Sequence, residues 1–264
     1  IPSMGAAGAA IATTFSQALV TIIFIYIGKK NKEIYTRVKF FTKPDLYCIK
    51  RIIKLGLPPF VQTAIHSSIS MVLTRFIANF GDVAVAVLNI GTQIESITWL
   101  SAEGFGSAIS AFIGQNFGAK KTNRIKQGYK KGIQILGTIG FFSSLLLIVG
   151  ARSLFRIFTP DDPVAIREGI HYLRILGLSQ FFMATEIGTA GAFNGLGKTV
   201  PPTLIGVIFN LLRIPMALVL SSTNLGLLGI WWAISLSSMI KGTVSPLIYY
   251  HMINNKLCHL VENN

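Results

Sequence analysis

The feature that most constrains the fold is a series of seven apolar stretches, most of them as long as a membrane is thick. A helix rises about 1.5 Å per residue, so about 20 apolar residues span the roughly 30 Å hydrocarbon core of a bilayer. The stretches lie at 7–28, 55–78, 83–115, 132–150, 170–194, 200–222 and 226–250. The sequence therefore predicts an all-α, polytopic membrane protein with about seven transmembrane helices.

The composition supports this class and argues against a nucleic-acid partner. Hydrophobic residues make up 51% of the 264 residues, charged residues only 13%, and the mean hydropathy is +0.58. In soluble proteins about a quarter of the residues are charged. The net charge of +14 comes mostly from Lys and Arg in the connections between apolar stretches, which is the pattern of membrane topology. We therefore expect membrane lipids, and no nucleic acid, around this chain.

The distribution of Lys and Arg also predicts the orientation, because cytoplasmic connections carry the excess of positive charge. The connection at 29–54 holds nine of these residues, the one at 79–82 none, and the one at 116–131 six. We expect the connections at 29–54 and 116–131, the turn at Lys198 and the C-terminal tail to lie on the cytoplasmic side of the cell membrane.

The connection at 29–54 is the longest and separates one helix from a block of six. The first and last predicted helices share four residues at an offset of 221, Gly5, Gly8, Ala12 and Ser16 recurring as Gly226, Gly229, Ala233 and Ser237. Such an echo is expected where two related bundles build one transporter. The predicted organisation is the last helix of an otherwise absent first lobe at 1–28, a basic cytoplasmic linker at 29–54, a six-helix C-terminal lobe at 55–250 and a cytoplasmic tail at 251–264.

The stretch at 83–115 carries a polar stripe. At about 100° per residue, six polar side chains fall within about 100° of one another on a helix, namely Asn89, Gln93, Ser96, Glu103, Ser107 and Ser110. Polar side chains are costly in lipid, so this face is expected to line a protein interior or a watery cavity. Asn89 and Gln93 are candidate substrate contacts, or else form interhelical hydrogen bonds. Glu103, closer to the cytoplasmic end, is a candidate for the mouth of the cavity.

A second, weaker stripe lies on the stretch at 55–78, where Gln62, His66 and Ser70 share one face of a helix. His66 is about a dozen residues past Lys54, which places it near the middle of the membrane. Gln62 and His66 are candidate cavity residues. The competing interpretation of His66 is a packed side chain whose hydrogen bonds are satisfied.

Two carboxylates, Glu95 and Glu186, also fall near the middle of the membrane. A buried carboxylate costs several kcal/mol unless it is paired, protonated or bound to an ion. One interpretation is an ion-coupling site that binds a proton or Na⁺. The others are a static bridge with Arg213 as the charge partner, or exposure to an aqueous cavity. Glu95 lies about 110° from the centre of the polar stripe on its own helix.

Several phrases spread over nearly the whole chain resemble those of multidrug and toxic compound extrusion (MATE) transporters. They are Lys54-Leu-Gly-Leu-Pro58, Val85-Ala-Val-Leu-Asn-Ile-Gly91, Ile113-Gly-Gln-Asn-Phe-Gly-Ala-Lys120, Gly191 to Pro202, Arg213-Ile-Pro215 and Gly226 to Trp231. That family has twelve helices in two six-helix lobes with the substrate cavity between them. The resemblance implies that this chain holds helix six, the linker and helices seven to twelve.

The resemblance also implies a function, which is secondary active efflux of amphipathic organic cations in exchange for Na⁺ or H⁺. Family members commonly carry an acidic residue on the helix of Glu186, which makes Glu186 the leading candidate for ion coupling and Glu95 the second. No cofactor is expected besides the coupling ion, and a separate first lobe is an expected partner.

Two alternatives remain open. A lipid-linked oligosaccharide flippase of the same superfamily would be favoured by a cationic cavity, because its substrates are anionic. A non-transporting fragment or assembly partner would need a missing first lobe. An enzyme is not expected, since no catalytic or metal-ligand cluster is present in the sequence. The Gly195–Thr199 segment lacks the full spacing of a phosphate-binding loop.

Overall fold

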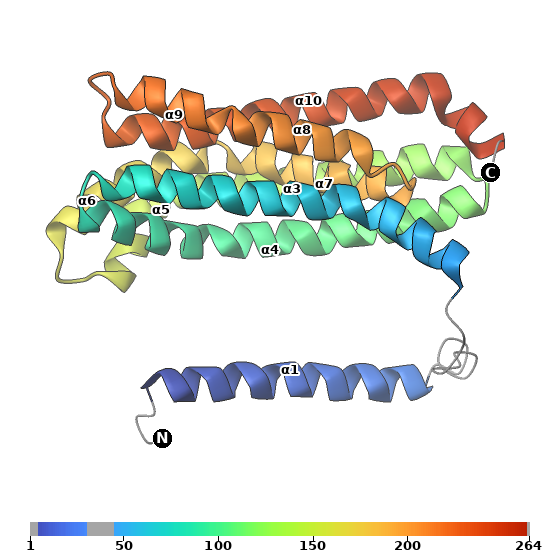
Figure 1. The fold of residues 1–264 in the computed structure, drawn as a ribbon, viewed down its shortest axis with the longest axis horizontal. Helices are drawn as coiled ribbons and strands as arrows, with labels where there is room; N and C mark the ends of the chain where they lie inside the picture. The colour runs from blue at the N-terminus through green and yellow to red at the C-terminus, as the bar shows by residue number, and fades with distance from the viewer. Residues whose placement is uncertain (1–4, 31–44, 263–264) are drawn as a thin grey trace. The chain divides into compact units, whose positions relative to one another are not determined.

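The computed structural model describes residues 5–30 and 45–262, and in these ranges it contains helices and turns but no strand (Figure 1). Contacts divide the chain into two units, Ile1–Lys50 and Arg51–Asn264. The first unit contains α1 (Gly5–Lys30), and the second contains a helical bundle. The all-α class predicted from the sequence is confirmed.

The bundle is built from helices that lie lengthwise, and most of them connect through turns at its two ends (Figure 1). They are α3 (Leu46–Ala78), α4 (Asp82–Gly118), α5 (Thr122–Phe158), α6 (Pro163–Gly177), α7 (Gln180–Gly195), α8 (Val200–Leu211), α9 (Arg213–Ser221) and α10 (Leu227–Glu262).

Five helical segments among the described residues are long and apolar enough to cross a membrane. They are Ala10–Gly28, Asp82–Gly118, Thr122–Phe158, Val200–Ser221 and Leu227–Ile253. The predicted stretch at 55–78 lies inside α3, and the stretch at 170–194 is divided between α6 and α7. The chain is therefore a polytopic membrane protein, while the count of seven spanning helices stays a prediction.

Two breaks interrupt helices that the sequence predicts to be continuous. Between α6 and α7, the Ser179 hydroxyl donates to the carbonyl of Leu176 at 2.8 Å, and such side-chain bonds compete with the helix ladder. Between α8 and α9, Pro215 has no backbone N–H for the carbonyl four residues earlier, so the helix breaks at Leu212. The second break places Arg213 at the start of a helix.

The predicted cytoplasmic connections are more helical than expected. Only 119–121 separate α4 from α5, so most of the predicted loop at 116–131 is helix. The reason is amphipathicity, because Ile125 is buried while basic side chains such as Arg124 and Lys126 are exposed. The last nine residues of the predicted linker, 46–54, likewise belong to α3, whereas 31–44 lie outside the described residues.

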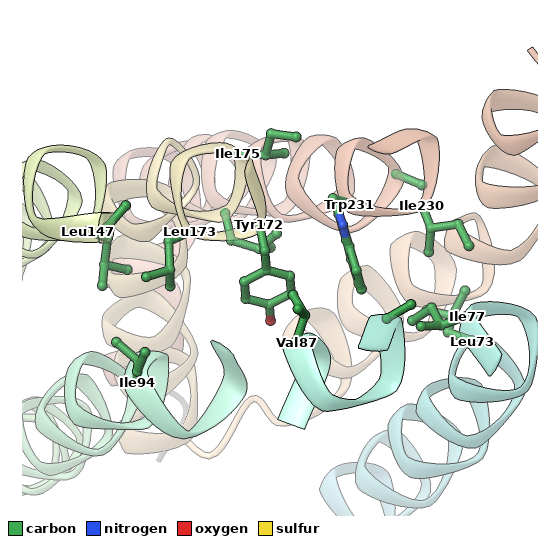
Figure 2. Close-up of a cluster of buried hydrophobic side chains, with 14 of the residues drawn as sticks. Leu73, Ile77, Val87, Ile94, Leu147, Tyr172, Leu173, Ile175, Ile230 and Trp231 are labelled. Carbon is green, nitrogen blue, oxygen red and sulfur yellow. The ribbon is translucent and has the colours of Figure 1, made fainter. Parts of the chain in front are cut away.

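The bundle has two apolar cores at different levels along its length. The first gathers side chains around the edge-to-face pair of Tyr172 and Trp231, whose ring centroids are 4.8 Å apart (Figure 2). The second lies around Phe193 and Tyr249. On α10 the buried residues between the two cores are mostly polar, namely Ser235, Ser237, Ser238, Lys241 and Ser245. A polar layer therefore separates two apolar cores.

Candidate functional site: the polar layer of the bundle

The polar layer takes its charged groups from four helices. We define it as Glu95 on α4, Gln180 and Glu186 on α7, Arg213 on α9, and Ser237, Ser238 and Lys241 on α10. Charged groups in a membrane interior are costly, so they pair or serve function. The layer contains two acids and two bases, and its formal charges therefore balance.

The only salt bridge among the described residues joins Glu186 to Lys241. The Lys241 Nζ lies 3.2 Å from Glu186 Oε2, and the two side chains are 9% and 14% exposed respectively. The predictions did not include Lys241, which lies inside the apolar stretch at 226–250. A lone lysine among serines in the middle of an apolar stretch is the signal that could have identified it.

A close approach of α7 and α10 holds this pair in position. Gly242 packs on the backbone of Phe182, and a Cβ at position 242 would overlap that backbone. The Thr185 hydroxyl also contacts the Gly242 carbonyl oxygen at 3.4 Å. Glycine next to Lys241 is therefore required for the two helix backbones to meet within a turn of Glu186.

Arg213, the predicted charge partner of the acids, makes its direct bonds elsewhere. Its Nε donates to Ser237 Oγ at 2.6 Å, and its Nη2 donates to Ser238 Oγ at 3.0 Å. It is buried and attracts both Glu186 and Glu95 electrostatically, without a salt bridge to either. The prediction of Arg213 as direct partner is therefore corrected, because the break at Leu212 aims its side chain at α10.

Glu95 lies on the face of α4 that packs into the bundle. Its Oε2 accepts a hydrogen bond from Gln180 Nε2 at 3.1 Å, and the Tyr172 hydroxyl interacts with the same carboxyl group. Within the described part of the chain, Glu95 Oε1 and Gln180 Oε1 are buried without a hydrogen-bond partner. Glu95 is thus held by neutral groups, and Gln180 and Tyr172 are neighbours that the sequence did not reveal.

His66 and Gln62 occupy one flank of the layer. His66, on α3, interacts electrostatically with Arg213, Lys241 and Glu186. Gln62, one turn earlier, packs its side chain against Gly206 of α8. The structure therefore brings His66 close to the charged groups, whereas Gln62 contributes to the contact between α3 and α8.

The polar stripe of α4 lies apart from the layer. Asn89, Gln93 and Glu103 are exposed. At about 100° per residue, the stripe points about 150° away from the buried face of α4, which includes Val87 and Ile94. The predicted cavity residues therefore fall into two groups. Half-buried Gln62 and exposed His66 lie on the α3 flank of the layer, whereas Asn89, Gln93 and Glu103 point away from it.

The chain is similar to known multidrug transporters. The family model MatE matches residues 58–219. "Probable multidrug resistance protein NorM" of Thermotoga maritima is 30% identical over 254 residues, which are 94% of this chain and 53% of that protein. "Multidrug export protein MepA" of Staphylococcus haemolyticus is 24% identical over 94% of this chain and 54% of that protein. The chain thus spans about half the length of these curated relatives.

The fold is also similar to a solved transporter structure. The structure described as the outward-facing conformation of a multidrug resistance MATE family transporter of the MOP superfamily superposes with a TM-score of 0.85 at 21% identity. The match covers 95% of this chain and 57% of that one. At this identity the likeness supports the fold, and the polar layer has to be interpreted from its own residues.

Proposed function

The chain belongs to the MatE family, and on this premise we propose that it forms one lobe and the preceding helix of a drug exporter. As a member of this family it is a multi-pass protein of the cell membrane and not an enzyme. Its relatives are named as multidrug resistance and multidrug export proteins. The proposed activity is secondary active efflux of amphipathic organic cations in exchange for Na⁺ or H⁺.

The observation that carries the proposal is the ion pair of Glu186 with Lys241 in the middle of the bundle. A carboxylate that bridges α7 and α10 can exchange its lysine partner for a proton or Na⁺. Binding of that ion changes the net charge of the layer and removes the ion pair that joins the two helices. An ion that binds one access state better than the other shifts the equilibrium between them.

Glu95 is proposed as the second ion-coupling residue. Its carboxyl group faces Gln180 and Tyr172 and has one unpaired oxygen. An unpaired buried oxygen is costly, and a proton or cation on it would remove that cost. Glu95 therefore supports proton or cation uptake inside the bundle, deeper than Glu186.

The exposed stripe of α4 is proposed as the part of the lobe that faces substrate. Asn89, Gln93 and Glu103 offer amide groups and one negative charge on a single helix face. Since they point away from the bundle core, they require a second surface to form a cavity. The proposed partners are therefore organic cations, membrane lipids and a first lobe.

The test is efflux of a cationic dye from cells that express the chain alone, with a first lobe, or with a first lobe and Glu186→Gln. We expect ion-driven efflux only with both lobes, and its reduction to background by Glu186→Gln. The matched control is Asp161→Asn, an exposed acid in the turn before α6, which should leave efflux unchanged. Equal efflux by the parent and Glu186→Gln would refute the assignment of Glu186.

A second candidate function is suggested by the cationic groups of the layer. Arg213 and Lys241, with His66 beside them, offset the two acids, and an anionic substrate such as a lipid-linked oligosaccharide would be attracted to these cations. Translocation of a fluorescent lipid-linked oligosaccharide in vesicles distinguishes this flippase from a cation exporter. Failure of both assays even with a first lobe would favour a non-transporting assembly partner.

A further inference from the structure

Lys241 combines a charged bond with residual access to solvent. Its ammonium group lies 3.2 Å from Glu186, and both side chains keep a small exposed fraction. Arg213, by contrast, donates its side-chain hydrogen bonds to the hydroxyls of Ser237 and Ser238. Among the bases of the layer, Lys241 is thus the one whose departure would free a carboxylate for another cation.

The backbone next to Lys241 is closely packed, which favours opening of the ion pair by movement of side chains. Gly242 lies directly on the Phe182 backbone, and Thr185 contacts the Gly242 carbonyl oxygen. The lysine side chain has four flexible carbons and ends in a compact point charge. It can therefore swing between acceptors while α7 and α10 stay in place.

A second acceptor lies at the same level on the neighbouring helix. Asn210 on α8 is 2% exposed, and its Oδ1 has no hydrogen-bond partner within residues 45–262. A buried acceptor without a partner is costly, so such an oxygen calls for a donor.

The register of the helices places Asn210 level with Lys241. The α8–α9 segment runs antiparallel to α10, because Gly229 packs on Leu220 while Arg213 bonds to Ser237 and Ser238. One helical turn beyond the Arg213 contact, α8 reaches Asn210 and α10 reaches Lys241. At about 1.5 Å per residue on both helices, the two positions are level.

We propose that Lys241 is a built-in competitor for the coupling ion, which holds Glu186 when no ion is bound and moves to Asn210 Oδ1 when one binds. This inference rests on the proposed role of Glu186 and names the residues that set its ion affinity. Binding of a proton or Na⁺ then raises the net charge of the layer by one while Lys241 stays charged. The added positive charge disfavours an organic cation nearby, which links ion entry to substrate release.

Other groups near Glu186 stay the same in this exchange. His66 faces it from α3 and Arg213 from α9, while Glu95 on α4 interacts with Arg213. On α5 the Tyr129 hydroxyl is hydrogen-bonded to Thr189, which lies one turn after Glu186 on α7. A variant of Lys241 or Asn210 leaves all of these side chains unchanged.

The experiment measures proton binding at Glu186 directly. The full chain in lipid nanodiscs is treated with a hydrophobic carbodiimide, which reacts with a protonated carboxylic acid, and labelling of Glu186 is followed by mass spectrometry against pH. Lys241→Gln should move half-maximal labelling to higher pH by about one unit, a tenfold gain in proton affinity, because the competing ammonium is gone. Asn210→Leu should move it to lower pH, because Lys241 then has no other acceptor.

Combining the two variants tests whether Asn210 acts through Lys241. If Asn210 acts only through Lys241, Asn210→Leu has no effect in the Lys241→Gln background. Lys241→Arg should keep the midpoint at or below that of the parent. Lys126→Gln and Asn123→Leu, exposed positions on α5, are the matched controls and should not move it.

Two results would overturn the proposal. One is an unchanged labelling midpoint in Lys241→Gln. The other is a shift caused by Asn210→Leu that persists in the Lys241→Gln background. Should Lys241→Gln fail to fold, the opposite shift expected for Asn210→Leu still decides. This result is separate from the proposed function, which fails if Glu186→Gln retains efflux. Labelling can shift as expected in a protein that does not transport, and transport can depend on Glu186 without any role for Lys241.

Discussion

The junction of α7 with α10 and the junction of α7 with α4 each bury a carboxylate, but in different ways. Glu186 has a cationic partner at 3.2 Å and a side chain that is 14% exposed. Glu95 has the neutral Gln180 as its hydrogen-bond partner and one buried oxygen without a bond. A carboxylate with a displaceable cation suits ion exchange, whereas one among neutral groups suits storage of a proton. The partner of a buried carboxylate is therefore more informative about its role than its depth in the membrane.

The largest effect is expected from breaking the first junction. Lys241→Met leaves Glu186 buried without its cation and should lower the free energy of unfolding by about 3–5 kcal/mol. The double variant Lys241→Met/Glu186→Gln removes both charges and should recover most of that loss. Denaturant unfolding in detergent measures both, and an additive double variant would show that the two side chains are not coupled.

A smaller effect is expected where the two helices touch. Gly242→Ala introduces a Cβ that overlaps the Phe182 backbone, and we expect a loss of about 1–3 kcal/mol because the helices must separate. Gly104→Ala, on a part of α4 where a Cβ meets no atom within 4 Å, is the control and should be neutral or slightly stabilising. A tolerated Gly242→Ala would mean that α7 and α10 are not held together here.

Neutralising Glu95, at the junction of α7 with α4, should have only a small effect on stability. Glu95→Gln keeps the shape of the side chain and its neutral neighbours, so stability should change by about 1 kcal/mol or less. This small change contrasts with the large loss of stability expected for Lys241→Met. A loss of about 3 kcal/mol or more in unfolding experiments would indicate that Glu95 is ionised and has a cationic partner.

The smallest effect on stability is expected on the exposed stripe of α4. Asn89→Ala and Gln93→Ala remove exposed side chains and should change the free energy of unfolding of this chain by about 0.5 kcal/mol or less. Their effect should appear instead in the KM for drug when a first lobe is present. A larger loss of stability in the chain alone would place these amides in contacts within the lobe.

Much of the fold was predictable because it depends on local pattern. Apolar length predicted the membrane class, and the spacing of Asn89, Gln93 and Glu103 predicted a polar face of one helix. The same periodicity placed Glu95 off that face, in agreement with its position toward the bundle core. The sequence pattern does not predict the helical starts of α3 and α5, because runs of basic residues are as typical of a loop as of the exposed side of an amphipathic helix.

The sequence alone determined that this chain crosses a membrane, how its basic connections distribute, and that Glu95, Glu186 and Arg213 bring charge into an apolar interior. These properties depend on residue type and on neighbours a few positions away. Only the tertiary structure decided that Glu186 pairs with Lys241 rather than Arg213, and that Asn210 is level with that lysine. Such pairings join helices far apart in sequence, and they follow from helix register, from the break at Leu212 and from the close contact at Gly242. Local periodicity does not encode these three features.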